Sequence, residues 1–501
     1  MDVTTEVLVI GAGPAGVTTA LLLARHGVAV ECVDKHAGVS LLPRARGVHA
    51  RAVEILRACG VENDMRAAEL CITPRFVMRP DLASAPTREI ITGGGGLSEV
   101  SPCEGIAISQ DVFDGVLREH AGRAGIRIHS EVELLGYLVT DVGVTADLLD
   151  RRTGTRFTGS CRYLIGADGW HSRVRDKMGA VPEGPADLGS SRVVSFRADL
   201  SRWVPEPPPA LIQLTATQGL LLRTHADHRW LVVRAQGDDN PTDPHELVRQ
   251  SLGLPQLDLD LITDWTWTAA AQLTDQLSDG PVFLVGDAAH RVPPAGATGI
   301  SSAMADAHNL AWKLAAALQG WAGPALLDSY AAERGQVGAA TTEAARQLWR
   351  FRDNPGRAPI DLRMLDMGYV YGDPDSLVGD LAGPYLPTAR SGTRAPHVWL
   401  DSDRTRSTLD LFGPGFTLLS TTDGHPWPEA ASLAAARTGA PLTVSVCTEP
   451  TFAEAYQLSG PDAVLIRPDG HVACRVPAAP EPSRTAESLT RAVARAVGMD
   501  S

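Results

Sequence analysis

The stretch VLVIGAGPAGVTTALLLARHGVAVECVD, which runs from Val7 to Asp34, decides the fold of the amino-terminal part of this chain. Its first four residues are apolar without polar alternation, which is typical of a central parallel strand. GAGPAG forms a turn, VTTALLLARH has helical spacing that ends at Gly27, and VAVECVD predicts a second strand. The stretch is therefore a βαβ unit with very short connections.

The glycines between the first strand and the helix match G-x-G-x-x-G. Gly11 permits the tight turn, Gly13 lets the backbone approach a pyrophosphate, and Gly16 lets the helix pack close to the strand. The helix amino terminus then faces the phosphates, and Asp34 would bind the ribose hydroxyls of an adenosine. This pattern predicts a bound dinucleotide, but it does not separate FAD from NAD.

Two later segments also place an aspartate directly after an apolar strand. YLIGADG places Asp168 there, and VFLVGDAAHRVPP places Asp287 there. A buried carboxylate in such a position is costly unless it has a partner, so Asp287 is expected to meet a ligand. We expect His290, three residues further, to pack or cap beside the loop.

The remaining sequence predicts two further units. From about 182 to 280, strand-like runs separated by turns indicate a mainly antiparallel domain inserted into the first. After a linker rich in Pro, Gly and Asp at about 353–394, strands and helices alternate again and predict a small α/β domain. The GGGG at 93–96 belongs to an irregular insertion between Pro74 and about 104.

Composition restricts the class of protein. The 501 residues are enough for roughly three domains. The net charge of −14 argues against nucleic acid or an anionic membrane as a partner. The seven cysteines are scattered without a C-x-x-C pair, which fits a reducing cytoplasm and gives no metal site. No apolar run is long enough to span a membrane.

In combination, these motifs resemble the flavoprotein aromatic hydroxylases, the single-component FAD monooxygenases that include p-hydroxybenzoate hydroxylase. The similarity covers nearly the whole chain and is greatest to the bacterial branch that tailors polycyclic aromatic natural products. It includes the glycine motif, PRARGVHARAVEIL, the helix that opens at Gln110, the D-G pair at 168–169, the G-D pair at 286–287 and DAHNLAWKLA. The tail APHVWLD…STLDLFGPGFTLLS matches as well.

The resemblance implies an α/β fold with three parts. These are a discontinuous Rossmann-like FAD-binding domain, a substrate-binding domain with a mainly antiparallel β-sheet, and a thioredoxin-like carboxy-terminal domain without C-x-x-C, which we expect to be structural. The expected boundaries are 1–73, 105–181 and 275–390 for the first, 74–104 and 182–274 for the second, and 391–501 for the third.

The resemblance also implies site residues. Asp287 accepts a hydrogen bond from the ribityl chain, because a carboxylate only accepts and ribityl offers hydroxyl donors. Arg44 and Pro293 are candidates for a catalytic role beside the flavin. Apart from the resemblance, His49 after PRARG and Arg223 on or between strands of the second domain are candidates for substrate contact because of their positions. The residues expected to contact FAD are Gly11, Gly13, Ala15, Gly16, Asp34, Lys35, Arg44, Gln110, Asp168, Asp287, Pro294, Gly299 and Ile300.

One segment departs from the family pattern. Relatives usually have G-G-x-G-[LM]-N after the two prolines, whereas this chain reads GATGISS. Ala297 replaces a glycine and Ser301 replaces an asparagine. The backbone donors can survive this change, but the flexibility of the loop and its flavin contact differ.

The function that the resemblance implies is hydroxylation of an aromatic substrate, through a flavin C4a-hydroperoxide, with NADPH or NADH as transient reductant and O₂. Two alternatives stay open: Baeyer–Villiger insertion or epoxidation on a similar substrate, and an FAD-binding protein without turnover that acts as a ligand carrier or assembly partner. We expect a cytoplasmic monomer or homodimer.

Overall fold

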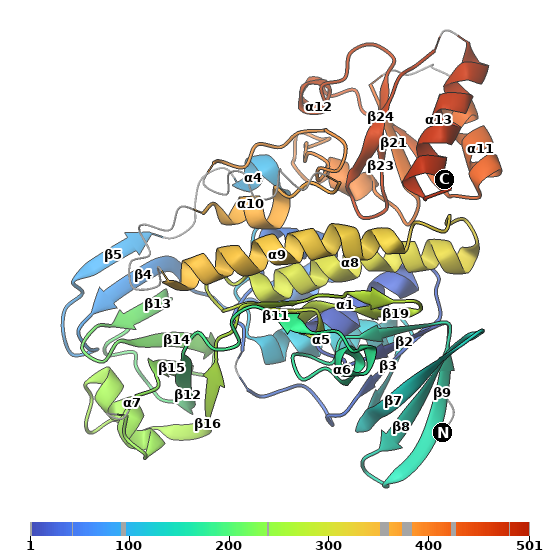
Figure 1. The fold of residues 1–501 in the computed structure, drawn as a ribbon. Helices are drawn as coiled ribbons and strands as arrows, with labels where there is room; N and C mark the ends of the chain where they lie inside the picture. The colour runs from blue at the N-terminus through green and yellow to red at the C-terminus, as the bar shows by residue number, and fades with distance from the viewer. Residues whose placement is uncertain are drawn as a thin grey trace.

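The computed structural model describes residues 3–42, 44–91, 97–237, 240–350, 360–372, 383–421, 427–479 and 481–499. Pro43, the GGGG at 93–96 and much of the expected linker lie outside these residues. Figure 1 shows a central body with a large sheet to one side of it and a smaller sheet at the carboxy-terminal end.

A six-stranded sheet forms the centre of the body, in the order β18-β19-β10-β2-β3-β6. Strand β2 is fully buried and is paired in parallel with β3 and β10, as its unbroken apolar sequence predicts. Only β18 runs antiparallel to its neighbour. The strands are β2 (Val7–Ile10), β3 (Val30–Asp34), β6 (Arg127–Ser130), β10 (Tyr163–Gly166), β18 (Ser278–Asp279) and β19 (Val282–Leu284).

Long helices cover this sheet. Helix α1 contacts α5 and α8, and α9 lies along α8 (Figure 1). Helix α5 begins at Gln110, where the sequence places its start. The helices of the body are α1 (Pro14–Arg25), α2 (Ala50–Ala58), α3 (Glu62–Ala67), α4 (Leu97–Val100), α5 (Gln110–Arg123), α6 (Arg173–Met178), α8 (Thr298–Gln319), α9 (Asp328–Arg350) and α10 (Leu362–Met367).

Two smaller sheets border the body. One has four strands in the order β1-β9-β8-β7, and the other has three in the order β11-β17-β20. Their strands are β1 (Val3–Thr4), β7 (Val132–Thr140), β8 (Gly143–Asp150), β9 (Thr155–Cys161), β11 (Pro182–Glu183), β17 (Gln272–Thr274) and β20 (His290–Arg291).

A seven-stranded sheet carries the inserted segment, in the order β16-β12-β15-β14-β13-β4-β5. All its pairs are antiparallel except β13 with β4. Its outer face packs on helix α7 (Pro244–Leu252) through one hydrophobic cluster that includes Val194, Ile212 and Leu247. The strands are β4 (Thr73–Arg79), β5 (Arg88–Ile91), β12 (Ser190–Arg197), β13 (Pro209–Leu214), β14 (Gly219–His225), β15 (Arg229–Ala235) and β16 (Asp260–Thr268).

The carboxy-terminal unit has a four-stranded sheet in the order β22-β21-β23-β24. Its core includes Trp312 of α8 and Trp321, so it is continuous with the body. The Asp469 carboxylate accepts a hydrogen bond from Trp312 Nε1 at 3.2 Å, and Arg467 pairs with Glu333 at 2.6 Å. The elements are β21 (Phe416–Ser420), α11 (Trp427–Thr438), β22 (Leu442–Val446), α12 (Pro450–Ala455), β23 (Ala463–Ile466), β24 (Val472–Val476) and α13 (Pro482–Ala496).

Candidate active site

The glycine turn packs tightly on one side and is open on the other. Gly11 has φ +103°, and a Cβ there would lie 2.3 Å from the carbonyl oxygen of Ala167. A Cβ on Gly16 would lie 1.9 Å from the carbonyl oxygen of Gly11, so α1 could not approach the strand. By contrast, a Cβ on Gly13 would meet nothing within 4 Å. Gly13 caps α1 without any side-chain cap, so the first-turn N–H groups remain free for an anion.

Asp34 ends β3 beside this turn and is already partnered. Its Oδ1 accepts from the backbone N–H of His36 at 3.0 Å, and its Oδ2 accepts from Arg118. The same Arg118 Nη2 donates to the carbonyl oxygen of Ala12 at 2.9 Å. Arg118 thus joins α5 to the glycine turn and the acid, a role that the sequence did not suggest. Lys35, the next residue, is exposed.

The start of α5 brings a second set of polar groups to the turn that contains Arg44. The backbone N–H of Gln110 donates to Ala45 O at 3.1 Å. One helical turn further, Asp114 is buried, and its Oδ1 has no hydrogen-bond partner. Burial raises the pKa of Asp114 to about 7, against the opposing effect of Arg118. Asp114 thus retains one oxygen that can accept a further hydrogen bond.

Asp168 lies directly after β10, as predicted. Its Oδ2 accepts from the backbone N–H groups of Arg173 at 2.8 Å and Val174 at 3.3 Å, at the start of α6. Its Oδ1 is buried and has no partner, and burial raises its pKa. Asp168 therefore retains one acceptor for a further group.

Asp287 lies just after β19, as the sequence predicts. It lies in a short 3₁₀ turn, Gly286–Ala288, and a Cβ on Gly286 would lie 2.9 Å from Ala15 Cβ, so the turn packs directly on α1. The protein surrounds Asp287, and burial raises its pKa although His290, Arg44 and Arg291 oppose this shift. Yet the residue keeps an exposed surface. The Asp287 carboxylate is therefore enclosed by protein but is still accessible to a ligand hydroxyl.

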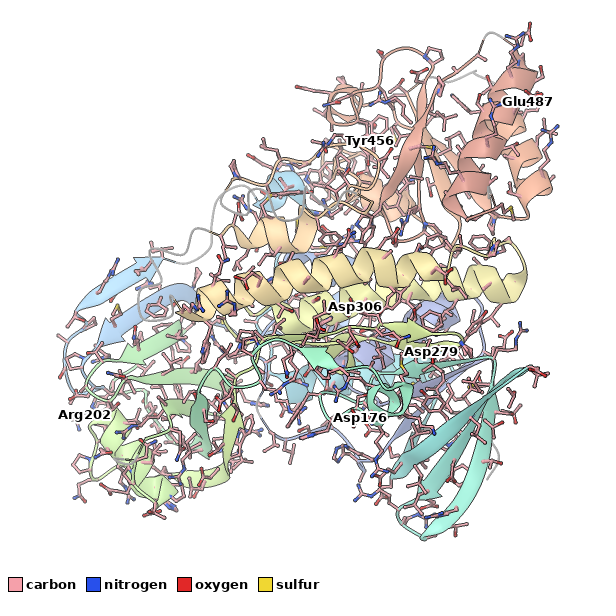
Figure 2. All side chains as sticks on the ribbon, in the orientation of Figure 1. Asp176, Arg202, Asp279, Asp306, Tyr456 and Glu487 are labelled. Atoms are coloured by element: carbon pink, nitrogen blue, oxygen red, sulfur yellow. The ribbon has the colours of Figure 1, made fainter. Side chains whose placement is uncertain are left out.

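A buried ionic network of Asp306, His290 and Arg334 holds the turn that contains Asp287 in place. Asp306 of α8 lies at the centre of the molecule (Figure 2) and accepts from His290 Nε2 at 2.7 Å and from the Gly286 N–H at 3.0 Å. Arg334 of α9 donates to its other oxygen at 2.7 Å. Burial disfavours the protonated form of His290, but the negative charge of Asp306 outweighs this effect, so the pKa of His290 is raised. His290 is therefore a positioning residue in a network that the sequence analysis missed.

The loop from Pro293 to the start of α8 follows the turn that contains Asp287. Pro293 is buried and Pro294 is exposed. Ala297, which replaces the usual glycine, adopts φ +54° as the residue that precedes α8. Gly299 and Ile300 lie in the first turn of that helix, where N–H groups lack intrahelical partners.

Ser301 and His49 connect this loop to the segment that follows Arg44. The Ser301 hydroxyl accepts from the backbone N–H of His49 at 3.2 Å. The His49 ring pairs with Asp366 of α10. Burial opposes a proton on His49, but Asp366 raises its pKa. His49 is thus already paired with Asp366 and linked to the first turns of α8.

Arg223, the other candidate for substrate contact, lies on the outer face of the seven-stranded sheet. Its guanidinium lies over the Trp230 ring at 5.5 Å and donates to Ala226 O at 2.8 Å, with Glu206 as its ion-pair partner. Because residues alternate along a strand, Arg223 lies on the same face as Leu221, toward α7. It is a structural residue of the sheet.

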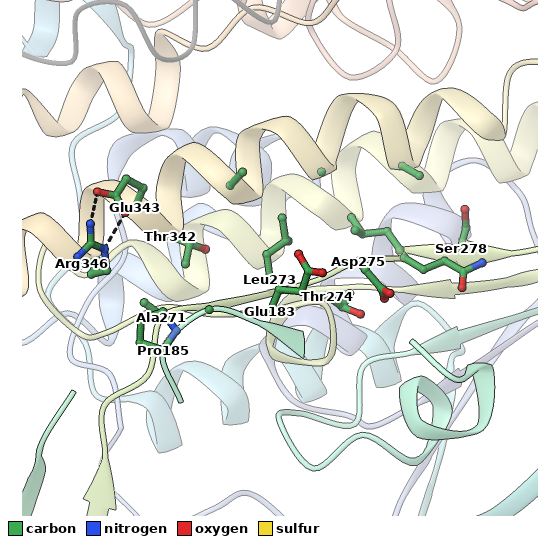
Figure 3. Close-up of a pocket in the computed structure, with 16 residues that line it drawn as sticks. Glu183, Pro185, Ala271, Leu273, Thr274, Asp275, Ser278, Thr342, Glu343 and Arg346 are labelled. Atoms are coloured by element: carbon green, nitrogen blue, oxygen red, sulfur yellow. Dashed lines mark hydrogen bonds and ion pairs between the residues drawn. The ribbon is translucent and has the colours of Figure 1, made fainter. Parts of the chain in front are cut away.

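A separate surface groove of about 530 Å³ lies between α9 and strands β11 and β17 (Figure 3). Glu343 and Arg346 pair with each other at its rim. None of the predicted cofactor or substrate residues lines this groove. The groove is therefore not the site assembled around the glycine turn.

Comparison with known proteins decides the family. Residues 4–345 match the FAD binding domain family, and residues 388–499 match the family described as aromatic-ring hydroxylase, C-terminal. The chain belongs to the FAD-dependent aromatic-ring hydroxylases. This confirms the expected family, the α/β fold class and the FAD cofactor.

The hydroxylase has relatives of similar length. It is 35% identical to a tetracenomycin A2 monooxygenase-dioxygenase of Streptomyces glaucescens, over 98% of this chain and 97% of that protein. It is 33% identical to a 4-methyl-5-nitrocatechol 5-monooxygenase of a Burkholderia species, over 95% and 94%. The crystal structure of aklavinone-11 hydroxylase with FAD and aklavinone superposes with a TM-score of 0.87, at 31% identity over 98% of both chains.

Two further observations apply to the described residues of the hydroxylase. They contain no group of three His, Cys, Asp or Glu side chains that could hold a metal ion. Nor do they form a helix that is both long and apolar enough to cross a membrane.

Proposed function

We propose that this monooxygenase hydroxylates a polycyclic aromatic substrate of the polyketide type, with NADPH or NADH as reductant and O₂ as oxidant. The observation that carries the proposal is the inner face of the seven-stranded sheet, a broad apolar wall whose partly buried side chains belong to none of the hydrophobic clusters formed by the described residues. The relatives named above are described by compounds as different as tetracenomycin A2, 4-methyl-5-nitrocatechol and aklavinone. The extent of this apolar face therefore bears on the size of the substrate.

The inner face is organised in cross-strand rows. One row joins Met78, Gln213, Leu220, Val233, Val193 and Trp265 across six strands. Of these residues, Met78, Leu220, Val233 and Trp265 are only partly buried. The next row on the same face includes Phe76, Leu211, Leu222 and Leu231, which are also partly buried. These side chains belong to none of the hydrophobic clusters formed by the described residues.

The inner face is turned toward the FAD-binding body. Trp267 on this face contacts Trp349 of α9, with ring centroids 5.9 Å apart. Arg291, four residues after Asp287, donates to Thr268 O at 3.2 Å. An apolar wall that begins next to the flavin loops and spans six strands suits a flat ring system of several fused rings.

The residues of the site fit FAD. The open backbone at Gly13 and the free N–H groups of α1 would hold the diphosphate, and Asp34 with Lys35 would lie at the adenosine ribose. Arg44, Gln110 and Asp168 would lie along the dinucleotide. The unpartnered Asp168 Oδ1 and the accessible Asp287 offer acceptors to cofactor hydroxyl groups.

The flavin ring would lie against Pro293 and Pro294, between the inner face and α8. The first-turn N–H groups at Gly299 and Ile300 would donate to the ring and stabilise negative charge on it. When bound, FAD supplies hydride acceptance from the nicotinamide and activation of O₂. The part of the chain is to bind, orient and exclude water; Arg44 and Pro293 remain the proposed residues beside the reacting atoms.

The organisation and setting of the enzyme are part of the proposal. We propose the division into an FAD-binding part, a substrate-binding part and a carboxy-terminal part at the boundaries given above. All seven cysteines are free thiols, and the reductant is a nicotinamide, which supports a cytoplasmic enzyme. A monomer or a homodimer is expected, and light scattering distinguishes the two.

Substrate-dependent NADPH or NADH oxidation tests the proposal. Polycyclic phenols should accelerate oxidation by the FAD-loaded enzyme under air and should gain one hydroxyl group by mass spectrometry. A lactone or epoxide product would favour Baeyer–Villiger insertion or epoxidation, and tight binding without any product would favour a carrier. Acceleration only by single-ring phenols would contradict the polycyclic class.

A further inference from the structure

Arg46 is the second arginine of the PRARG segment. Its side chain extends toward the seven-stranded sheet and not toward the residues that are predicted to contact FAD. Its backbone is fixed, because Ile108 N–H donates to Arg46 O at 3.3 Å and Gln110 N–H donates to Ala45 O at 3.1 Å. Its Nη2 donates to Ala210 O in β13. The next residue of β13, Leu211, already belongs to the inner face.

Among the described residues, the guanidinium of Arg46 has no counter-charge. Its Nε and Nη1 atoms are buried and have no hydrogen-bond partner, and no carboxylate of the described residues pairs with it. Burial alone lowers its pKa to about 10. A guanidinium has five N–H donors, and here one carbonyl oxygen is the acceptor.

By contrast, several other arginines of the described residues that are largely enclosed by protein pair with a carboxylate. Arg334 pairs with Asp306 at 2.7 Å, Arg467 with Glu333 at 2.6 Å, and Arg394 with Glu54 at 2.9 Å. A buried cation without such a partner is strongly unfavourable. Arg46 is therefore a cation whose partner is a ligand.

The position of Arg46 indicates that its ligand is the substrate and not FAD. The groups that would meet the dinucleotide lie at the glycine turn, where Arg118 contacts Ala12 and Asp34. Arg46 instead contacts the edge of the apolar wall. Gln213, which lies on that wall, also has a buried side-chain oxygen without a partner. Two unsatisfied polar groups on one apolar surface indicate a ligand that is mostly apolar and carries oxygen substituents.

We propose that Arg46 binds an ionised oxygen of the aromatic substrate, so that the enzyme selects polycyclic compounds with an acidic ring hydroxyl or a carboxylate. This inference rests on the proposed function and narrows its substrate class. The planar guanidinium suits such an oxyanion, because it donates two parallel hydrogen bonds and carries the opposite charge. A substrate bound as its anion has a more electron-rich ring, which favours attack on an electrophilic oxygen.

Binding of two matched probes to the FAD-loaded enzyme tests this assignment. 2-Hydroxy-1,4-naphthoquinone is an anion near neutral pH, and 2-methoxy-1,4-naphthoquinone is its neutral counterpart. Their dissociation constants follow from the change in the flavin absorption spectrum. Wild-type enzyme should bind the anion at least about tenfold more tightly, which corresponds to about 1.4 kcal/mol.

Three variants provide the controls. Arg46→Met should abolish the preference for the anion and leave the affinity for the methoxy probe nearly unchanged, whereas Arg46→Lys should retain part of the preference. Arg202→Met makes the same charge change at an exposed position of the same domain, beside Trp203 (Figure 2), and should behave as wild type. The FAD content of each variant shows whether the fold is intact.

Several outcomes would overturn the assignment. Wild-type enzyme could bind the two probes equally tightly, or bind neither at about millimolar concentration. Arg46→Met could also weaken the binding of both probes by the same factor. A preference for the anion that survives in Arg46→Met would overturn the assignment as well. Failure of the proposed function has a different signature, since no aromatic compound would then accelerate NADPH or NADH oxidation.

Discussion

Replacing Asp306 with asparagine should destabilise the FAD-binding part of the enzyme and loosen the turn that contains Asp287. The carboxylate receives three donors, from His290 at 2.7 Å, Gly286 N–H at 3.0 Å and Arg334 at 2.7 Å, and its side chain is almost fully buried. Asparagine keeps one acceptor oxygen and turns a donor toward the others, while Arg334 loses its counter-charge.

The size of the effect follows from that uncompensated charge. Breaking a buried ion pair from one side costs about 3–5 kcal/mol. Since 1 kcal/mol shifts Tm by about 2–4 °C in domains of 150–250 residues, Tm should fall by roughly 6–20 °C. The lower part of this range is expected because the FAD-binding part is larger. FAD should also dissociate more readily, because Asp287 is then less well held.

Thermal unfolding followed by flavin fluorescence measures both effects. Asp176→Asn is the matched control, since it removes a carboxylate that pairs with Arg175 at 3.1 Å and is mostly exposed (Figure 2). That variant should change the free energy of unfolding by less than about 1 kcal/mol. An Asp306→Asn enzyme that unfolds and releases FAD at the wild-type temperature would show that the network of Asp306, His290 and Arg334 does not stabilise the FAD-binding part.

Three further changes have defined outcomes. Ala297→Gly should raise the free energy of unfolding by up to about 1 kcal/mol, because φ +54° strains alanine but not glycine, and a lower Tm would contradict this. In the folded enzyme the pKa of Asp114 is raised to about 7, so its neutral form is stabilised and stability falls as pH rises from about 4 to 7. Asp114→Asn removes this loss, so its Tm advantage should grow across that pH range; a constant difference would refute the shift. Removal of residues after 390 should give an aggregating or heat-labile protein, because Glu54 loses Arg394 and Trp312 loses Asp469. A truncated enzyme that keeps FAD and the wild-type Tm would show that these contacts are dispensable.

The sequence predicted those parts of the site that depend on neighbours along the chain. The glycine turn, the start of α5 at Gln110 and the aspartates after β10 and β19 all follow from local strand and turn patterns. A strand pattern also places alternate residues on opposite faces, so the position of Arg223 beside Leu221 could have excluded it from the inner face.

The partners that complete the site could not be predicted in this way. Arg118 and Asp34 are 84 positions apart, and His49 and Asp366 are 317 apart. The sequence shows neither which helix faces cross nor which charges become buried together. The same limit applies to Arg46, whose significance depends on which described side chains lie around it in three dimensions, none of them a carboxylate that pairs with it.

Transfer of an oxygen atom from O₂ to an aromatic ring is the central claim, and isotopically labelled O₂ tests it most directly. The FAD-loaded enzyme would be incubated with NADPH or NADH, a polycyclic phenolic substrate and the labelled gas, and the product examined by mass spectrometry. We expect one labelled oxygen atom on an aromatic carbon of the product for each NADPH or NADH consumed. Consumption of the reductant that yields only hydrogen peroxide, or a hydroxylated product without the label, would contradict the claim.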